Sequence, residues 1–371
     1  MTEEYSQSLK NCLDTSINEY IKEKVFTGAS IGIVCCSHGE FKRVTLCYGK
    51  TGDSEKAIDF NTFYDLASLT KPLVTVFSIL ALIKNRKIKW NENLESLLSQ
   101  SIPIDKKNIT LIHLLSHCSG LPAHKQYDEI LSNIPPDQRK KEIIDRILHE
   151  DLICRPGEQN IYSDLGYILL GKSIEKKSGM KLDEFWKEKI IDPLGLGEKM
   201  FFPKKEQRDK NSFASTGYCP ELKRNLYGIV HDDNCRFIGG IAGHAGLFGT
   251  IEGVLLFCEN ILKGYDNIFT HPSYNNDDLR KALKMQDNSP WTLGFDTPLP
   301  GASSSGRYFS PASVGHLGFT GTSFWIDLQR KIGIVLLSNR TFYGAKNEKL
   351  KKVRPIVHDL LMKEILKYIL E

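Results

Sequence analysis

The first fifty residues carry a helical pattern followed by two strand patterns. Residues 30–36 and 41–48 are rich in apolar and β-branched residues, and His38-Gly39 between them supplies a turn, so this segment predicts a β-hairpin. Ahead of the hairpin, apolar residues at helical spacing predict an amphipathic helix; they are Leu9, Leu13, Ile17, Tyr20 and Ile21.

The end of the chain repeats this combination of strands and helix. Residues 323–327 and 331–338 predict a second hairpin. Residues 354–370 predict a closing helix with one apolar face, formed by Val357, Leu360, Leu361 and Ile365. Between the two ends the pattern is mainly helical, and the candidate helices are residues 73–85, 111–116, 138–149, 162–178 and 182–189.

Strands at both chain ends with helices between them predict an α/β (α+β) fold. One antiparallel sheet is expected to be built from both chain ends and flanked by helices. A mainly helical subdomain, about residues 76–224, would be inserted between the two parts of the α/β region, about residues 1–75 and 225–371. We expect residues 1–371 to form a single catalytic domain with its cleft at the seam between the two regions.

The charge and the cysteine content limit which classes of binding partner and which cellular compartments are expected. The formal net charge of +4 gives no reason to expect nucleic acid as a partner. The first twenty residues lack the features of a signal peptide, and the apolar stretch 73–83 is too short to span a bilayer, so no membrane association is expected. The nine cysteines are an odd number and fit a reducing compartment. We expect a cytoplasmic protein, or a periplasmic one if a leader has been removed; the oligomeric state is open.

Ser68 and Lys71 form a Ser-x-x-Lys pair beside the most apolar run of the chain. A serine is a poor nucleophile until a base removes its proton, and a residue three positions on lies on the same helix face. Pro72 costs little only in the first turn of a helix, so it predicts that the helix begins close to Ser68. The pair is weak evidence alone, because the same spacing recurs at Ser173 and Lys176.

Three sequence segments in a characteristic order strengthen the evidence that Ser68 and Lys71 form a functional pair. They are residues 65–72 (D-L-A-S-L-T-K-P), 162–167 (Y-S-D-L-G-Y) and 315–321 (G-H-L-G-F-T-G). With these motifs the chain resembles the serine β-lactamase and penicillin-binding-protein superfamily. It is most similar to the class C-like branch, which includes esterases, D-amino-acid peptidases and muropeptide amidases. Supporting stretches are residues 109–122, 155–157 and 230–249, and the resemblance covers about residues 20–370.

The resemblance implies a β-lactamase/transpeptidase-like fold and a role for each motif residue. Ser68 is expected to attack an acyl carbon and form an acyl-enzyme, while Lys71, Tyr162 and His316 handle its proton. The backbone N–H groups of Ser68 and Phe319 would form the oxyanion hole. Lysine titrates near ~10.4 and tyrosine near ~10 when unperturbed, so the pKa of Lys71 or Tyr162 must be lowered for either to act as a base at neutral pH. The residues leave open which of the two takes the proton.

Two positions depart from the lactamase pattern. Asp164 stands where that pattern has Asn, and an ionised Asp only accepts hydrogen bonds, so a substrate that presents a donor or an amine is expected. His316 replaces the Lys of K-T-G and carries a weaker, pH-dependent positive charge, so strong binding of a β-lactam carboxylate is less expected. Asp164 and Gly318 are the expected substrate-binding residues.

These features predict a serine hydrolase of the penicillin-binding-protein type. It would cleave an amide or ester bond, as an amidase, peptidase or esterase, in a peptidoglycan-derived peptide or a small ester, with no cofactor. Two alternatives stay open: a β-lactamase proper, and a non-catalytic relative that binds a peptide or wall fragment. The complete set of Ser68, Lys71 and Tyr162 argues against the binder.

Other candidate residues have simpler structural explanations. His113 and His117 are four positions apart, a spacing that suits zinc, but two histidines rarely complete a tetrahedral site, so no metal is expected. Residues 231–234 (H-D-D-N) predict a hydrogen-bonded turn rather than a cation or substrate site. Trp291 and Trp325 are assigned to the core.

Glycine recurs at every third position from 240 to 249. A phosphate-binding loop would need a following Lys-Ser/Thr, which this segment lacks, so the run predicts close backbone packing beside the active site. His244 lies inside the run, and the sequence leaves open whether it is structural or faces the cleft.

Overall fold

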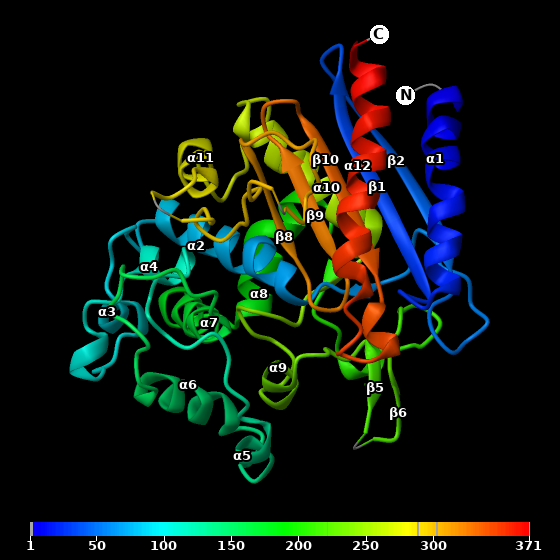
Figure 1. Ribbon diagram of the computed structural model, residues 1–371. Helices are drawn as coiled ribbons and strands as arrows, with labels where there is room; N and C mark the ends of the chain where they lie inside the picture. The colour runs from blue at the N-terminus through cyan, green and yellow to red at the C-terminus, as the bar shows by residue number, and fades with distance from the viewer. Residues whose placement is uncertain (1–2, 221, 288, 302, 371) are drawn as a thin grey trace.

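A five-stranded antiparallel sheet forms the centre of the computed structural model, which describes residues 3–220, 222–287, 289–301 and 303–370 (Figure 1). The strand order is β2-β1-β10-β9-β8. The strands are β1 (Gly28–Ser37), β2 (Glu40–Gly49), β8 (Ser313–Leu317), β9 (Ser323–Asp327) and β10 (Ile332–Ser338). Both predicted hairpins are therefore confirmed, and one sheet joins the two chain ends as expected.

Strand β1 connects the N-terminal hairpin to the C-terminal strands. Its residues are buried from Gly28 to Cys35, and it pairs with β2 on one side and β10 on the other, with Ile31 opposite Leu336. The hairpin turn has positive φ at His38 (51°) and Gly39 (82°), which matches the right-handed twist of the flanking strands.

The two terminal helices cover one face of the sheet. They are α1 (Glu3–Lys22) and α12 (Lys349–Leu370), which lie side by side in Figure 1. Leu13 of α1 and Leu361 of α12 are fully buried in one apolar cluster with Ile33 of β1. Both helices are confirmed, although α12 begins at Lys349 and not at residue 354.

Helix α10 (Ile251–Tyr265) packs against β1 and β10 from the other side of the sheet. The sequence analysis did not predict this helix. Its buried residues are distributed around most of its circumference. They include Ile251, Val254, Leu255, Phe257, Cys258, Ile261 and Leu262.

Short helices fill the middle of the chain, as predicted. They are α2 (Phe77–Lys84), α3 (Leu94–Leu98), α4 (Leu111–Leu115), α5 (Asp128–Ser132), α6 (Arg139–His149), α7 (Asp164–Ser178), α8 (Leu182–Trp186), α9 (Asp233–Phe237) and α11 (Asn276–Leu283). Short strands β3 (Tyr64–Asp65), β4 (Met200–Phe201) and β7 (Phe248–Gly249) form a second sheet, and β5 (Gly217–Cys219) pairs with β6 (Arg224–Leu226). The division of the chain at residues 75 and 225 stays a prediction.

Helix α2 continues the turn that carries Ser68. Within the described chain, Ala67–Lys84 is the one helical stretch apolar and long enough to meet the criteria for a membrane span, and 83% of it is buried inside the fold. Contacts with α7 and α8 surround α2. The apolar run 73–83 is thus a buried helix, as predicted.

Candidate active site

Ser68 lies in a short 3-10 turn that residues from distant parts of the chain hold in place. Ala67, just before it, has a positive φ of 48°. The Asp65 carboxylate accepts the N–H of Ala67 at 2.9 Å and the N–H of His231 at 2.7 Å. The Thr320 hydroxyl donates to the backbone carbonyl of Asp65 at 2.6 Å. These bonds keep a strained backbone in one conformation and so fix the direction of the Ser68 side chain.

The helical segment begins at this turn, as Pro72 predicts. One 3-10 turn, Ala67–Leu69, is followed by a π-helical segment, Lys71–Val76, which leads into α2. Pro72 lies in the first turn of that segment, where its missing N–H costs little.

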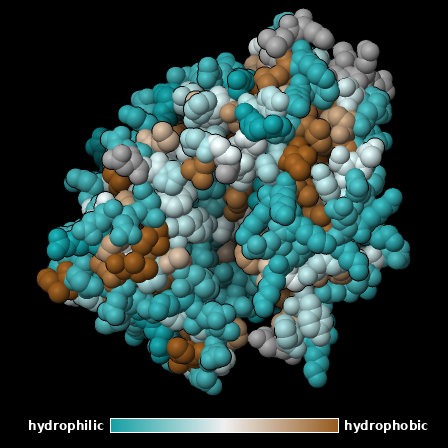
Figure 2. Space-filling view, viewed as in Figure 1, coloured by the Kyte–Doolittle hydropathy of each residue, from teal (hydrophilic) through white to brown (hydrophobic). Residues whose placement is uncertain are grey.

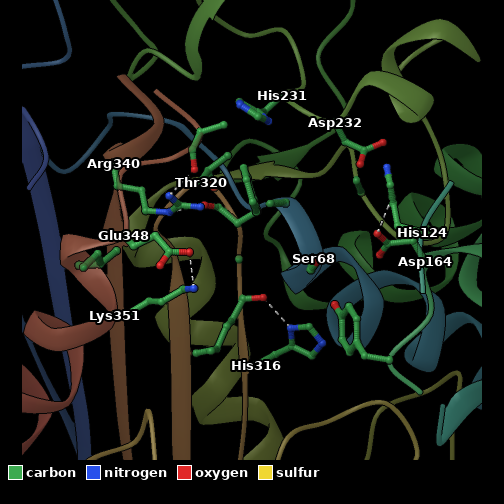
Figure 3. Close-up of a pocket in the computed structure, with 18 of the residues that line it drawn as sticks. Ser68, His124, Asp164, His231, Asp232, His316, Thr320, Arg340, Glu348 and Lys351 are labelled. Atoms are coloured by element: carbon green, nitrogen blue, oxygen red, sulfur yellow. Dashed lines mark hydrogen bonds and ion pairs between the residues drawn. The ribbon is translucent and has the colours of Figure 1, made fainter. Parts of the chain in front are cut away.

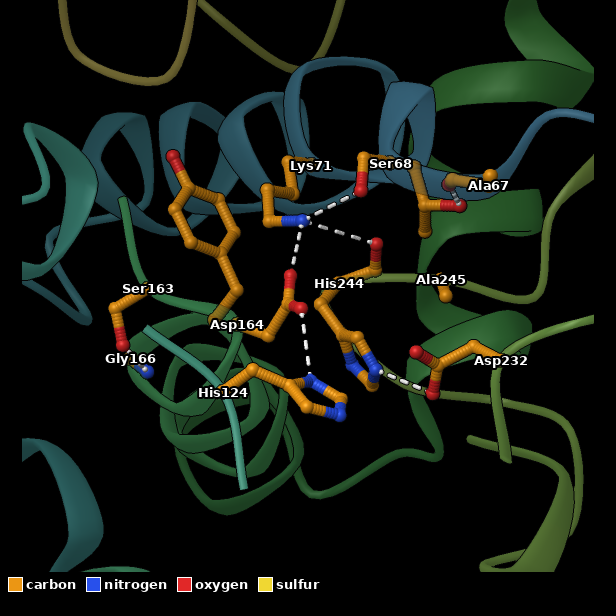
Figure 4. A network of polar contacts seen from close by, with 12 residues as sticks. Ala67, Ser68, Lys71, His124, Ser163, Asp164, Gly166, Asp232, His244 and Ala245 are labelled. Carbon is orange, nitrogen blue, oxygen red and sulfur yellow. Dashed lines mark hydrogen bonds and ion pairs between the residues drawn. The ribbon is translucent and has the colours of Figure 1, made fainter. Parts of the chain in front are cut away.

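Lys71 connects Ser68 to Asp164. Its ammonium Nζ donates to Ser68 Oγ at 2.8 Å and to Asp164 Oδ1 at 2.7 Å, and the Lys71 side chain is fully buried (Figure 4). Asp164 is the first residue of α7, where Ser163 forms the N-cap by accepting the N–H of Gly166 at 3.3 Å. This cap is the reason that the helix begins at Asp164 and not at residue 162.

The charge state of Lys71 differs from the one expected from sequence. Burial lowers the pKa of Lys71, but the neighbouring Asp164 carboxylate and Tyr162 together outweigh burial, and the pKa is raised. Burial raises the pKa of Tyr162 to about 12, although the Lys71 cation beside it acts in the opposite direction. The expectation that one of these two groups has a lowered pKa is therefore wrong. For Lys71 the reason is the buried negative charge of Asp164, which an Asn would not supply. For Tyr162 the reason is burial.

The Tyr162 ring packs between Lys71 and His117. Lys71 Nζ lies 4.7 Å from the centroid of the Tyr162 ring. The His117 ring stacks on the Tyr162 ring, with a distance of 4.4 Å between the two ring centroids. Side-chain interactions with Lys71 and Ser68 lower the pKa of Tyr162 and oppose the larger effect of burial. Tyr162 thus lies beside the Ser68–Lys71 pair, and its catalytic role stays a prediction.

His316, Gly318 and Phe319 lie at the end of β8 that packs against the turn of Ser68. His316 is buried, its Nδ1 lies 2.9 Å from the carbonyl of Leu317, and its Nε2 has no hydrogen-bond partner in the described structure. Burial lowers the pKa of His316, which favours the neutral ring. Gly318 is packed so closely that a Cβ there would lie 2.0 Å from Thr322 Oγ1.

The predicted oxyanion donors line one cavity. Ser68 and Phe319 both border it, and neither backbone N–H has a partner among the described residues. The cavity has a volume of about 770 Å³. Figure 2 shows a hollow in this face of the molecule, with hydrophilic residues along much of its border. The expected substrate-binding residues Asp164 and Gly318 also line the cavity.

Two histidines complete the polar network around Asp164. His124 Nδ1 lies 3.3 Å from Asp164 Oδ2, and this hydrogen bond raises the pKa of His124. Buried His244 is bonded through Nε2 to Asp232 Oδ1 at 2.9 Å (Figure 4). The sequence analysis missed His124, because no local motif marks it, and left His244 open; His244 faces Asp232 at the wall of the cleft.

His124, Asp164 and Asp232 are also the described residues that could hold a cation. One potential ligand atom of each lies within 4.8 Å of the other two. Asp164 already has the Lys71 ammonium 2.7 Å away, however, which neutralises its charge and would repel a metal ion. We therefore assign no metal to this group.

Most of the remaining sequence candidates have the expected structural roles. His113 forms a capping box with Thr110, and His117 Nδ1 accepts the N–H of Ser163 at 3.0 Å. Asp232 is the N-cap of α9 and accepts the N–H of Cys235 at 2.7 Å, so residues 231–234 begin a helix and do not form an isolated turn. These four residues also line the cavity.

The glycine run and Trp325 have packing roles, whereas Trp291 borders the cavity. Gly243 packs on Gly171, and a Cβ at Gly243 would lie 2.2 Å from the carbonyl of Tyr167, so the predicted close packing is confirmed. Trp325 is a core residue, as expected, whereas Trp291 lines the cavity.

Comparison with known proteins gives this geometry a family context. The family model described as beta-lactamase matches residues 14–356. Among curated proteins, a putative D-alanyl-D-alanine carboxypeptidase of Salmonella typhimurium is 31% identical over 320 residues, which cover 78% of this chain and 72% of that protein. The equivalent protein of Salmonella agona is 30% identical with the same coverage.

Solved structures show the same fold. The octameric penicillin-binding protein homologue from Pyrococcus abyssi aligns with a TM-score of 0.70 and 23% identity, over 93% of this chain and 76% of that one. EstCE1, a hydrolase with promiscuous acyltransferase activity, aligns with a TM-score of 0.72 and 19% identity, over 96% and 99% of the two chains. The resemblance and the fold expected from the motifs are both confirmed.

Proposed function

Because the chain belongs to the beta-lactamase family of serine hydrolases, we propose that it is a peptidase that forms an acyl-enzyme on Ser68. The observation that carries this proposal is the 2.8 Å hydrogen bond between Lys71 Nζ and Ser68 Oγ at the border of a large cavity. The putative carboxypeptidases of Salmonella support a peptide substrate that ends in D-amino acids.

The proposed reaction has two covalent steps. Ser68 Oγ bonds to the acyl carbon while its proton leaves for the Lys71–Tyr162 pair, and the C–N bond then breaks as the same pair returns a proton to the leaving amine. Water next attacks the ester by the same route and releases the acid. The N–H groups of Ser68 and Phe319 would bind the oxyanion in both steps.

The proton count of this site makes acylation pH-dependent. The resting site holds Lys71 as an ammonium and Tyr162 as a phenol, since the pKa of each is raised. Accepting the proton of Ser68 requires that this pair first lose one proton. We therefore expect the acylation rate to rise as the pH increases across the neutral and alkaline range.

The two alternatives are less well supported. A β-lactamase proper would be expected to use a permanent positive charge at the third motif, whereas burial lowers the pKa of His316. A non-catalytic binder has no need of a serine hydroxyl hydrogen-bonded to a buried ammonium. The cytoplasmic localisation expected from sequence also stays a proposal, and the nine cysteines, all free, are compatible with it.

Covalent labelling tests the nucleophile. The wild-type protein should react with a fluorophosphonate probe and gain one adduct by mass spectrometry, and Ser68→Ala should abolish the adduct. Ser173→Ala is the matched control, because Ser173 begins the second Ser-x-x-Lys and its hydroxyl is buried and donates to the carbonyl of Leu169 at 2.9 Å. Undiminished labelling of Ser68→Ala would exclude Ser68 as the nucleophile.

Substrate assays then separate the classes of hydrolase. We expect release of D-alanine from a peptide ending in D-alanyl-D-alanine, and slower turnover of a short ester and of nitrocefin. Faster turnover of nitrocefin than of peptide would favour the β-lactamase. No turnover of any of the three above the Ser68→Ala background would favour the binder.

A further inference from the structure

Asp65 is a buried carboxyl group without a cationic partner. Its residue is 3% exposed, and no lysine, arginine or histidine among the described residues forms an ion pair with it. Its two oxygens instead accept backbone N–H groups, Oδ1 that of Ala67 at 2.9 Å and Oδ2 that of His231 at 2.7 Å. A buried charge is costly unless hydrogen bonds compensate for the lost water, so the ionised form of Asp65 depends on both bonds.

The contacts of Asp65 reach both sides of the predicted oxyanion hole. One carboxylate bond holds the residue just before Ser68. The other holds His231, whose ring packs on the Phe319 ring with 5.2 Å between the two centroids, and the Thr320 hydroxyl donates to the Asp65 carbonyl. Ser68, His231 and Thr320 border one cavity (Figure 3). Asp65 therefore lies behind the cavity wall and connects the segments that carry both donors.

Only the ionised form of Asp65 makes two strong bonds of this kind. Protonation converts one oxygen into a hydroxyl, which is a donor and a weaker acceptor, so the backbone N–H that faced it loses a charge-assisted bond. At Ala67 that bond holds a backbone with a positive φ of 48°, a conformation that persists only where its surroundings fix it. The charge on Asp65 is thus linked to the shape of the Ser68 turn.

The surroundings of Asp65 bring its protonation close to neutral pH. Burial raises the pKa of Asp65 to about 7, whereas the backbone N–H groups of His231 and Ala67 act in the opposite direction. The neighbouring Asp232 carboxylate acts in the same direction as burial.

The other titratable and charged groups on the packed elements do not provide a counter-ion. They are the Arg236–Asp233 pair and Cys235 of α9, the Lys71–Asp164 pair, the His231 ring, His316 of β8 and Arg340. The two pairs each contain both signs of charge, and burial lowers the pKa of both histidines and raises that of the thiol. The Arg340 guanidinium donates to the carbonyl of Phe319 and not to Asp65.

We propose that Asp65 is a positioning residue whose ionised form holds the Ser68 turn and the His231 segment in the geometry for acylation, so that protonation of Asp65 slows the reaction. When the bond to Ala67 weakens, the backbone leaves its positive φ and the Ser68 N–H turns away from the place of the oxyanion. Weakening of the bond to His231 releases the ring that supports Phe319.

This inference rests on the proposed function, in which Ser68 is the nucleophile. It adds a loss of activity on the acid side of neutrality that is separate from the proton held by Lys71 and Tyr162. The two effects can be distinguished, because groups that two proteins share cancel when the rates of those proteins are divided.

The ratio of two labelling rates isolates Asp65. Asp65→Asn keeps the size of the side chain but has one acceptor oxygen and does not titrate. Fluorophosphonate labelling of both proteins is measured from pH 5 to pH 9, with circular dichroism as the check of folding. The ratio of wild type to Asp65→Asn should be at least about tenfold at pH 9, where Asp65 is ionised, and within about threefold at pH 5, where it is protonated. The change should be centred near the pKa of Asp65, about 7.

Asp59→Asn is the matched control. Asp59 Oδ1 also accepts a backbone N–H, that of Asn61 at 3.0 Å, but the residue is half-exposed and does not border the cavity. The ratio of wild type to Asp59→Asn should stay within about twofold across the whole pH range.

Ala67→Gly gives a second test that does not require Asp65→Asn to fold. Glycine adopts a positive φ without strain, so the turn of this variant should depend less on the carboxylate. The ratio of Ala67→Gly to wild-type labelling should therefore rise by at least about threefold as the pH falls from 9 to 5.

The outcomes distinguish this inference from the proposed function. A ratio of wild type to Asp65→Asn that is the same at pH 5 and pH 9, or a ratio for Ala67→Gly that does not change with pH, overturns the role of Asp65 while the nucleophile stands. Absence of labelling in the wild-type protein at every pH would instead remove the proposed function itself.

Discussion

The ion pair between Lys71 and Asp164 is the feature that most distinguishes this site at the level of single residues. In the pattern of the class C-like branch an Asn occupies the position of Asp164, and a neutral amide would leave burial as the dominant influence on Lys71. Here the carboxylate is 2.7 Å from the ammonium, and His124 bonds its other oxygen. A carboxylate in place of an amide at position 164 therefore favours the protonated form of Lys71 in the resting site.

Replacement of Asp164 by Asn should shift the pH dependence of acylation. Without the carboxylate, burial lowers the pKa of Lys71, so the neutral amine becomes populated at lower pH. We expect the rising limb of the pH profile for fluorophosphonate labelling to shift to lower pH by at least about one unit, so that labelling at a fixed pH becomes about tenfold faster. The rate is measured between pH 6 and pH 10 under single-turnover conditions.

His124→Gln is the control for this prediction. It removes the imidazole that bonds Asp164 Oδ2 at 3.3 Å but keeps the carboxylate beside Lys71. Its rising limb should therefore not shift to lower pH, because Asp164 then has one positive neighbour fewer and still raises the pKa of Lys71. An unchanged profile in Asp164→Asn would mean that Lys71 does not limit acylation.

At the scale of elements, the site depends on the contact between the end of β8 and the turn that carries Ser68. The Thr320 and Thr322 hydroxyls donate to the carbonyls of Asp65 and Leu66, which lie just before the nucleophile. These bonds join segments about 255 positions apart in the chain. The distance between the two predicted oxyanion donors is thus set by how closely the strand end approaches the turn.

Gly318→Ala should disturb this approach. A Cβ at position 318 would lie 2.0 Å from Thr322 Oγ1 and 2.7 Å from the Leu66 carbonyl, so the strand end must move away and take the Phe319 N–H with it. We expect kcat to fall by about 10²-fold or more, measured with the short ester.

Gly166→Ala is the matched control for Gly318→Ala. Its Cβ would meet Leu114 at 3.4 Å, an ordinary contact between α7 and α4, so kcat should change by less than about twofold. Equal kcat for Gly318→Ala and the wild-type protein would rule out Phe319 as an oxyanion donor.

At the scale of the whole molecule, the sheet is covered on one face by the first and last helices of the chain. Leu9, Leu13 and Ile17 of α1 are fully buried, and they belong to one apolar cluster with α12 and the sheet. This cluster does not include the residues around Ser68, which belong with the second, larger cluster. A change in the α1–α12 cluster is therefore made away from the residues that pack around Ser68.

Leu13→Ala should lower the free energy of unfolding by about 2–5 kcal/mol, because it leaves a cavity between α1 and its neighbours. Ile104→Ala is the control, since Ile104 is 80% exposed, and it should change that free energy by no more than about 0.5 kcal/mol. Urea unfolding measures both variants. A Leu13→Ala protein as stable as the control would show that α1 contributes little to the fold.

The sequence by itself determined the features that depend on local physics. Strand and helix periodicity located both hairpins and the terminal helices, because burial of one face imposes a repeat that can be counted along the chain. Pro72 located the start of the helical segment, and the spacing of Ser68 and Lys71 brought their side chains together. Helix α10 was not predicted from the sequence.

The tertiary structure alone decided the charges and partners of the site. Lys71 and Asp164 are 93 positions apart, and no local pattern indicates that the carboxylate lies close enough to raise the pKa of the lysine. His124 acquires its place in the site from Asp164, which is 40 positions away in the chain. Electrostatic interactions depend on distance and burial, and both are fixed only when the chain is folded.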